Sequence, residues 1–88
     1  MKEFTAIIKD PIGLHARPAT VAVKAACECG CDVKATYNGK TVDMKSIMGI
    51  MSLGVPTEAE ITITCNGDDE DIALESILEK LRNEKVIQ

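Results

Sequence analysis

Three stretches of the chain alternate apolar with polar residues, which is the pattern of a strand that buries one face. They span residues 3–9, 31–37 and 59–65. The positions on their apolar faces are Phe4, Ala6, Ile8, Cys31, Val33, Ala35, Tyr37, Ile61, Ile63 and Cys65. The dipeptide Asn38-Gly39 is typical of a two-residue hairpin turn, so we predict that residues 40–44 return as a fourth strand.

Three other stretches repeat apolar residues at helical spacing. The first helix is predicted over residues 16–28, with Pro18 in its first turn, where a missing N–H removes no intrahelical bond. Ser46 suits the N-cap of a short helix that ends near Gly54, and the acidic run 68–71 caps the last helix. The predicted core positions of the first and last helices are Ala19, Ala22, Val23, Ala26, Cys27, Leu74, Ile77, Leu78 and Leu81.

The predicted order of elements is therefore β-α-β-β-α-β-α. Strands with a single apolar face need cover on one side only, which three amphipathic helices supply. The sequence predicts an α+β fold, an open-faced two-layer β-sandwich in which a four-stranded antiparallel sheet carries three helices on one face. The 88 residues fit one domain over 1–88, with one core and no room for a deep catalytic cavity.

The charge of the chain argues against nucleic acid as a partner. The net charge is −4, and the first 50 residues carry +2 while the remaining residues carry −6. A nucleic-acid-binding domain is expected to be basic and to supply stacking aromatic side chains. Phe4 and Tyr37 are the only aromatic residues.

No apolar run is long enough to span a bilayer, and residues 1–4 lack the apolar core of a signal peptide, so we expect a cytoplasmic protein. In such a protein the four cysteines are expected to be free thiols. Cys27, Cys29 and Cys31 are spaced unlike a zinc-binding pair, and no histidine is placed to complete a set. We therefore expect structural cysteines, no metal and no cofactor.

The single histidine, His15, lies just before the first predicted helix, in Gly13-Leu14-His15-Ala16-Arg17-Pro18. The first N–H groups of a helix have no intrahelical acceptor, and the helix dipole adds partial positive charge there, so an anion is stabilised. The same field disfavours imidazolium and leaves a nucleophilic ring. Arg17 adds a guanidinium suited to phosphate oxygens. These features fit a phosphoryl group on His15, although a histidine that caps the helix or faces water fits equally well.

Ser46 is the second candidate, because a helix N-terminus can stabilise a phosphoryl group on its hydroxyl. From spacing alone, a plain N-cap is the more frequent role of such a serine. The apolar residues that follow cannot all be buried by a helix of two turns. Ile47, Met48 and Met51 are thus candidates for an exposed partner patch, with ordinary core packing as the alternative.

The segments Gly13-Leu14-His15-Ala16-Arg17-Pro18-Ala19 and Lys45-Ser46-Ile47-Met48-Gly49 resemble the two signature segments of the histidine-containing phosphocarrier family, HPr. Chain length, element order and the hairpin at residues 37–40 are also similar, so the resemblance covers essentially the whole chain. It implies the fold predicted above. It also implies a phosphoryl carrier in the phosphoenolpyruvate-dependent sugar phosphotransferase system rather than a free-standing enzyme.

The resemblance further implies the partners. Enzyme I would donate a phosphoryl group to Nδ1 of His15, beside Arg17, and sugar-specific enzyme IIA domains would receive it. Ser46 matches a serine that an ATP-dependent kinase phosphorylates in part of the family, where that form serves a catabolite-control regulator as corepressor. The chain would act as a monomer. The three cysteines near residue 29 and the aspartate at position 43 depart from the family pattern.

Thr20 and Lys24 follow Arg17 at helical spacing and extend its face, so they complete the predicted partner patch with Ile47, Met48 and Met51. Two other functions fit parts of the sequence. A regulatory binding module controlled at Ser46 would not need His15. A small acylphosphatase-like hydrolase would need a water-orienting amide that the sequence does not identify.

Overall fold

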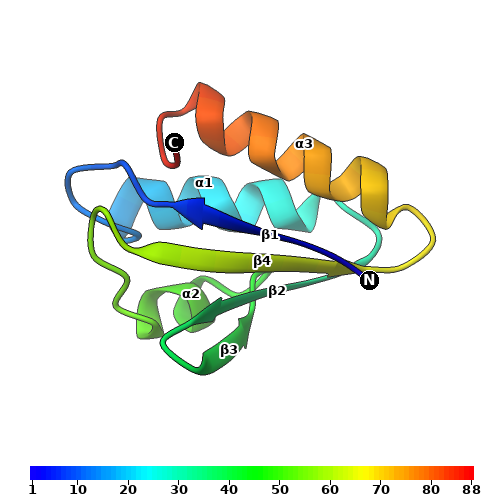
Figure 1. The fold of residues 1–88 in the computed structure, drawn as a ribbon, viewed down its shortest axis with the longest axis horizontal. Helices are drawn as coiled ribbons and strands as arrows, with labels where there is room; N and C mark the ends of the chain where they lie inside the picture. The colour runs from blue at the N-terminus through cyan, green and yellow to red at the C-terminus, as the bar shows by residue number, and fades with distance from the viewer.

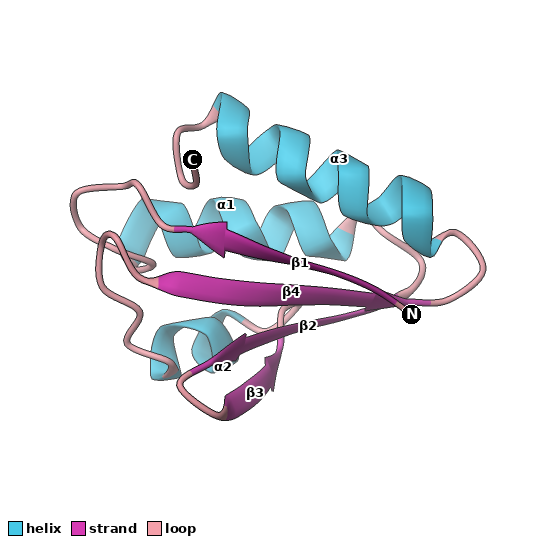
Figure 2. Cartoon of the chain, in the orientation of Figure 1, coloured by secondary structure: helices cyan, strands magenta, loops and turns pink.

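An antiparallel sheet of four strands, in the order β1-β4-β2-β3, forms one layer of the protein in a computed structural model that describes residues 1–88 (Figure 1). Three helices form the other layer (Figure 2). The elements are β1 (Lys2–Ile7), α1 (Ala16–Cys27), β2 (Asp32–Tyr37), β3 (Lys40–Asp43), α2 (Ile47–Ser52), β4 (Glu60–Asn66) and α3 (Glu70–Asn83). The predicted fold class and order of elements are therefore confirmed.

The two faces of the sheet differ in burial as the alternation predicts. The helix-facing positions that are fully buried are Ala6, Val33, Ala35, Ile61, Ile63 and Cys65. On the open face one row of threonines crosses all four strands, and it consists of Thr5, Thr62, Thr36 and Thr41. Hydroxyls join the outer pairs, with Thr5 to Thr62 at 3.0 Å and Thr36 to Thr41 at 2.8 Å. A slip of one residue would bury these hydroxyls, so the row favours the observed register.

The helices use side chains of different size against the sheet. α1 buries small residues, which allow its backbone to approach the strands closely, whereas α3 supplies the bulk of the core. The buried residues of α1 are Pro18, Ala19, Ala22, Ala25 and Ala26. Those of α3 are Ala73, Leu74, Ile77, Leu78 and Leu81. All four predicted core positions of the last helix are confirmed.

Several predicted core positions lie at the edge of the core and are partly or fully exposed. Cys27 is exposed and Val23 is only half-buried, because the face of α1 that packs on the core is turned toward Ala25. Phe4 keeps 38% of its surface and lies under Arg82, whose guanidinium carbon is 5.4 Å from the ring centre. A cation over the ring face stabilises an aromatic side chain that the helix layer does not fully cover.

The first strand ends earlier than the predicted residue 9. Beyond β1, Ile8 makes only a single bridge to Ile87, and the N–H groups of Lys9 and Asp10 donate to the Val86 carbonyl at 2.9 and 3.4 Å. Ile8 also bonds Ala59 and Glu58, just before β4, so the C-terminal segment adds pairing to the end of β1. This contact brings the end of the chain to the loop that precedes α1.

The start of α3 differs in detail from the predicted acidic cap. Asp69 occupies the N-cap but makes no side-chain capping bond. Glu70 instead accepts from the Gly67 N–H at 3.2 Å and pairs with the N-terminal amine at 2.7 Å. These contacts lower the pKa of Glu70, with the amine as the larger cause.

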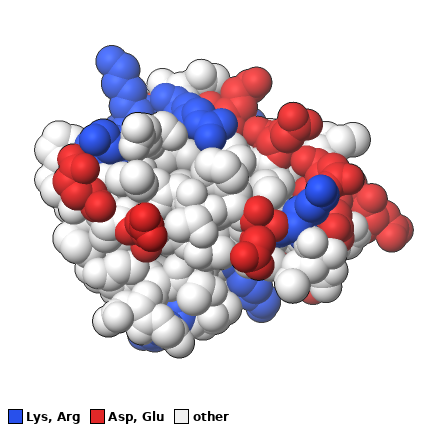
Figure 3. Space-filling view, viewed as in Figure 1, with Lys and Arg blue, Asp and Glu red and all other residues white.

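Acidic side chains gather along α3 and the loop before it, which gives one end of the molecule a negative surface (Figure 3). They are Asp68, Asp69, Glu70, Asp71, Glu75 and Glu79. His15 and Arg17 belong to the first 50 residues, which carry a net charge of +2. None of the three helices has the length and apolar character that crossing a membrane requires.

The four cysteines occupy three different environments. Cys31 and Cys65 are buried, Cys29 is half-buried and Cys27 is exposed. Burial, with a smaller contribution from the neighbouring Cys31, raises the pKa of Cys65 to about 12. Burial also raises the pKa of Cys29. Because the thiolate is the reactive form, Cys65 is protected both by its burial and by its raised pKa, whereas Cys31 is protected by its burial.

We therefore expect iodoacetamide to modify Cys27 first in the native protein at pH 7.5, Cys29 much more slowly, and Cys31 and Cys65 only after unfolding. Peptide mass spectrometry over a time course measures the order. The same protein in urea is the control, in which all four should react at similar rates. Modification of Cys65 as fast as Cys27 in the native protein would contradict the structure.

Candidate functional site

A tight turn delivers the chain from β1 to the start of α1. The Gly13 N–H donates to the Asp10 carbonyl at 2.9 Å, and the Ile12 N–H donates to Oδ1 of Asp10 at 3.0 Å. Leu14 is buried, and its N–H donates to the Val55 carbonyl at 2.9 Å. The turn is thus fixed to the segment that follows α2.

Gly13 is required at this position for two reasons. Its φ of +85° lies in the left-handed region that side chains disfavour. A Cβ on this residue would also meet the Val55 carbonyl oxygen at 2.5 Å, which is closer than real Cβ atoms come to backbone. Gly13 therefore permits the close approach that holds the start of α1 in place.

His15 is the N-cap residue of α1 and is exposed. Its Nδ1 accepts a hydrogen bond from the Ala16 N–H at 2.8 Å, so Nδ1 carries no hydrogen in this arrangement. Ala16 has a φ of +49°, in the left-handed region that costs a residue with a Cβ about 1 kcal/mol or more. The Nδ1 lone pair of His15 thus points at the first N–H of α1, and the ring lies at the start of the helix, as the sequence predicts.

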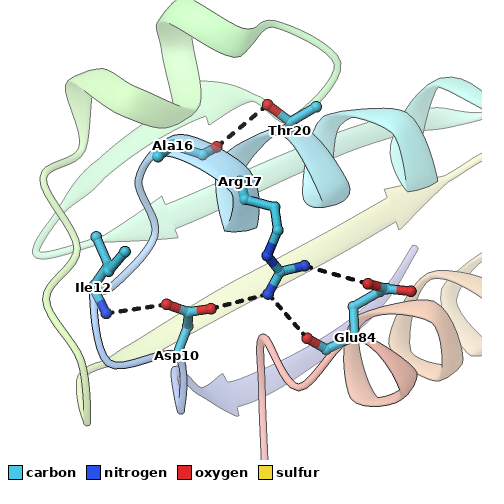
Figure 4. Close-up of polar contacts among 6 residues, drawn as sticks. All are labelled: Asp10, Ile12, Ala16, Arg17, Thr20 and Glu84. Carbon is cyan, nitrogen blue, oxygen red and sulfur yellow. Dashed lines mark hydrogen bonds and ion pairs between the residues drawn. The ribbon is translucent and has the colours of Figure 1, made fainter.

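The Arg17 side chain extends from the first turn of α1 toward Asp10 and Glu84 (Figure 4). Its Nη2 donates to Oδ2 of Asp10 at 3.2 Å and to the Glu84 carbonyl at 3.3 Å, and its Nη1 donates to Oε1 of Glu84 at 3.3 Å. The sequence predicts this guanidinium as a partner of phosphate oxygens beside the histidine. In the unphosphorylated protein it is engaged with two carboxylates and the end of α3 instead.

Ser46 caps α2, since its Oγ accepts from the Gly49 N–H at 3.1 Å. Asp43 supports the same turn from the preceding strand. Its Oδ1 accepts from the Lys45 N–H at 2.9 Å, and its carbonyl accepts from the Ser46 N–H at 3.0 Å. The plain capping role is therefore present, and the aspartate at position 43 is accommodated as part of it.

Ser46 and His15 lie toward opposite ends of α1. The ammonium of Lys45 donates to the Cys29 carbonyl at 2.9 Å, and the Cys27 thiol donates to the Lys45 carbonyl at 3.6 Å. The segment before α2 is thus fixed to the C-terminal end of α1. Leu14, by contrast, joins the N-terminal end of α1 to Val55, after α2. The two candidate residues are not in contact.

The predicted partner patch is exposed, as the sequence analysis expected. Met48 keeps 80% of its surface, Ile47 39% and Met51 38%. On α1, Lys24 is exposed, and Thr20 is exposed with its hydroxyl donating to the Ala16 carbonyl at 3.3 Å. The structure therefore leaves all five residues accessible to another protein.

Asp10 and Glu84 are the residues near this site that the sequence analysis missed. The turn segment Asp10-Pro11-Ile12-Gly13 could have indicated an aspartate that bonds its own backbone. No local signal, however, links Arg17 to Glu84, which is 67 positions away. That contact exists only because the C-terminal segment pairs with the loop before α1.

A family model described as the PTS HPr component phosphorylation site matches residues 2–83. The chain belongs to the HPr family. The histidine-containing phosphocarrier protein of Mycoplasma is 39% identical over 99% of both chains, with a TM-score of 0.93. The HPr of Bacillus anthracis is 40% identical over 90% of this chain and 94% of its own, with a TM-score of 0.83.

The chain is also similar to a protein of catabolite repression. Crh, the catabolite repression protein of Bacillus subtilis, described as a swapped dimer, is 42% identical over 92% of both chains, with a TM-score of 0.72. Membership in the HPr family makes this chain a phosphoryl carrier of the phosphotransferase system and not a catalyst in itself. It also implies partners within that system, such as enzyme I and enzyme II proteins.

We expect Gly13→Ala to destabilise this HPr-family protein by roughly 2 kcal/mol or more, because it adds a clash with backbone to a disfavoured φ. Gly39→Ala is the matched control, since Gly39 has a φ of +83° and open space around its Cβ position. Its loss is expected to be about 1 kcal/mol. Urea unfolding measures both, and equal losses would contradict the proposed contact with Val55.

Proposed function

We propose that this carrier takes a phosphoryl group from phosphorylated enzyme I onto Nδ1 of His15 and passes it to sugar-specific enzyme IIA domains. The observation that carries the proposal is an exposed imidazole at the N-cap of α1, with its Nδ1 lone pair 2.8 Å from the Ala16 N–H. We place this relay in the cytoplasm, with the chain acting as a monomeric single domain.

The transfer needs one nucleophilic atom and a place for negative charge. The Nδ1 lone pair forms the N–P bond while the bond from phosphorus to the donor's leaving atom breaks, and that electron pair departs with the donor. The Ala16 N–H releases Nδ1 and becomes available to a phosphoryl oxygen. Because the first N–H groups of a helix lack intrahelical acceptors and carry partial positive charge, they stabilise the new anion.

Exposed residues of α1 and α2 form the proposed docking surface. Ile47, Met48 and Met51 supply its apolar part, and Thr20 and Lys24 supply the polar and basic part on α1. Exposed methionines suit a surface that meets several partners, because the side chain is flexible and polarisable. Docking also excludes water from the transfer, which a carrier without a pocket of its own cannot do.

Incubation with phosphoenolpyruvate and enzyme I tests the carrier function. We expect acid-labile phosphate on His15, lost completely in His15→Ala and retained in Ser46→Ala. Phosphopeptide mapping locates the label, and circular dichroism of His15→Ala checks that the fold is intact. Label on another residue, or no label on the unmodified chain, would refute the proposal.

Regulation at Ser46 is the second part of the proposal. It is supported by the position of Ser46 at the N-cap of α2 and by the similarity to Crh. A phosphate there would add about −1.5 to −2 charges near neutral pH. An ATP-dependent serine kinase would supply it, and a catabolite-control regulator would recognise the product. The added charge would oppose docking of enzyme I on the surface beside α2.

We therefore expect Ser46→Asp to accept phosphate from enzyme I at least about tenfold more slowly than the unmodified chain, because of charge repulsion at the docking surface. Asn66→Asp, at the far end of β4, is the charge-matched control and should react at the normal rate. Kinase labelling should disappear in Ser46→Ala and persist in Ser52→Ala. An unchanged transfer rate in Ser46→Asp would exclude this form of regulation.

A purely regulatory binding module is the alternative that the similarity to Crh favours. In that case Ser46 would be phosphorylated while His15 accepted nothing from enzyme I. The labelling experiment with phosphoenolpyruvate separates the two functions directly.

A further inference from the structure

The geometry around Arg17 points to Asp10 as a positioning residue, which with Glu84 engages the guanidinium, competes with a phosphoryl group on His15 for it and so keeps the phosphohistidine labile. This inference rests on the proposed function of His15 as the phosphoryl acceptor. It concerns how strongly the carrier retains its phosphoryl group, and it depends on three oxygen atoms that already occupy Arg17 (Figure 4).

Asp10 is the stronger of the two restraints, because it is the only charged residue among the buried ones. Oδ1 accepts the Ile12 N–H at 3.0 Å, so the carboxylate cannot turn without breaking the loop before His15. Oδ2 pairs with Arg17 at 3.2 Å. Arg17 is the only cation paired with this carboxylate.

Separating Arg17 from Asp10 is less favourable for the carboxylate than for the guanidinium, because water can replace the lost contact only where the side chain is exposed. The Arg17 side chain keeps 56% of its surface and can be solvated elsewhere, whereas the Asp10 side chain keeps only 9%. A buried carboxylate without a cation or a compensating hydrogen bond is unfavourable. Moving Arg17 to a phosphoryl group on His15 leaves the buried Asp10 carboxylate with the Ile12 N–H but without its cation, which is unfavourable.

Glu84 adds a second restraint at the end of α3. It is the C-cap residue, so its carbonyl, which accepts from Nη2 at 3.3 Å, lies at the negative end of the helix dipole. Its carboxylate accepts from Nη1 at 3.3 Å and is itself about half exposed. Arg17 thus has acceptors from two separate elements in the unphosphorylated protein.

A phosphoryl dianion on His15 competes with these oxygens for Arg17. Whatever stability Arg17 gives to the phosphohistidine is reduced by the loss of its contacts with Asp10 and Glu84. Removing those contacts should free Arg17 to engage the phosphoryl group and make the adduct longer-lived. Without Arg17, the same substitutions should have no effect on the adduct.

Asp10→Asn tests this directly, because the amide oxygen can still accept from Ile12 while the charge toward Arg17 is lost. Glu84→Gln is the second variant, at an exposed side chain whose replacement does not threaten folding. We expect each to lengthen the half-life of purified phosphohistidine roughly three- to tenfold, as expected for the loss of an ion pair of this exposure. Glu58→Gln, which changes net charge equally and removes a pair with Lys9, should leave the half-life unchanged.

The same substitutions made in an Arg17→Ala background provide the decisive comparison, since a merely structural role would alter the half-life there as well. The half-life is followed by phosphorus NMR, and thermal unfolding confirms that each variant is folded. An unchanged or shorter half-life in both folded single variants, or a longer one that persists without Arg17, would overturn the inference. Failure of the unmodified chain to form phosphohistidine would instead overturn the proposed function.

Discussion

The unpaired amides at the start of α1 are the constraint on which the site depends. A helix cannot satisfy its own first N–H groups, so something else must accept from them. Here the acceptor is Nδ1 of His15, the atom proposed to carry the phosphoryl group. The nucleophile therefore occupies, in the resting protein, the place that a phosphoryl oxygen would take. Gly13 and Leu14, fixed against Val55, keep this helix end at the surface, where a partner can reach the ring.

A carrier differs from a binding protein because it must release what it has bound. Amides and an arginine around the histidine would together stabilise a phosphoryl group well, and an adduct held too tightly would not be passed on. The structure provides other acceptors for Arg17 in Asp10 and Glu84. Because Asp10 is buried, the loss of its cation is costly, and this cost opposes the contact between Arg17 and the phosphoryl group. The affinity of the site for a phosphoryl group thus depends on the contact that Arg17 gains with that group minus the contacts that it loses with Asp10 and Glu84.

Local patterns in the sequence predict most of the fold, and the misses have identifiable causes. Alternation in β2 and β4 and the Asn38-Gly39 turn were sufficient to predict these strands and the hairpin of β2 with β3, since each depends on neighbouring residues alone. The strand order β1-β4-β2-β3 was not predicted, because β4 pairs with strands that are distant in the sequence. The exposure of Cys27 was missed because helical spacing does not fix which face of an alanine-rich helix packs inward. The partners of Arg17 were missed for a different reason. They come together only when the C-terminal segment pairs beside the turn before α1, and no pattern near residue 17 contains that contact.

The separation of His15 from Ser46 limits how one can influence the other. They lie toward opposite ends of α1, whose 12 residues span about 18 Å, while charges in physiological salt are screened over about 8 Å. A phosphate on Ser46 therefore acts only weakly on His15 through solvent. The exposed apolar residues of α2 follow Ser46 directly, and a protein that docks on them also meets the charge at Ser46. The phosphate on Ser46 then inhibits transfer by repelling the docking protein and not by changing the His15 ring. The strength of this inhibition depends on the charge that each docking protein presents to α2.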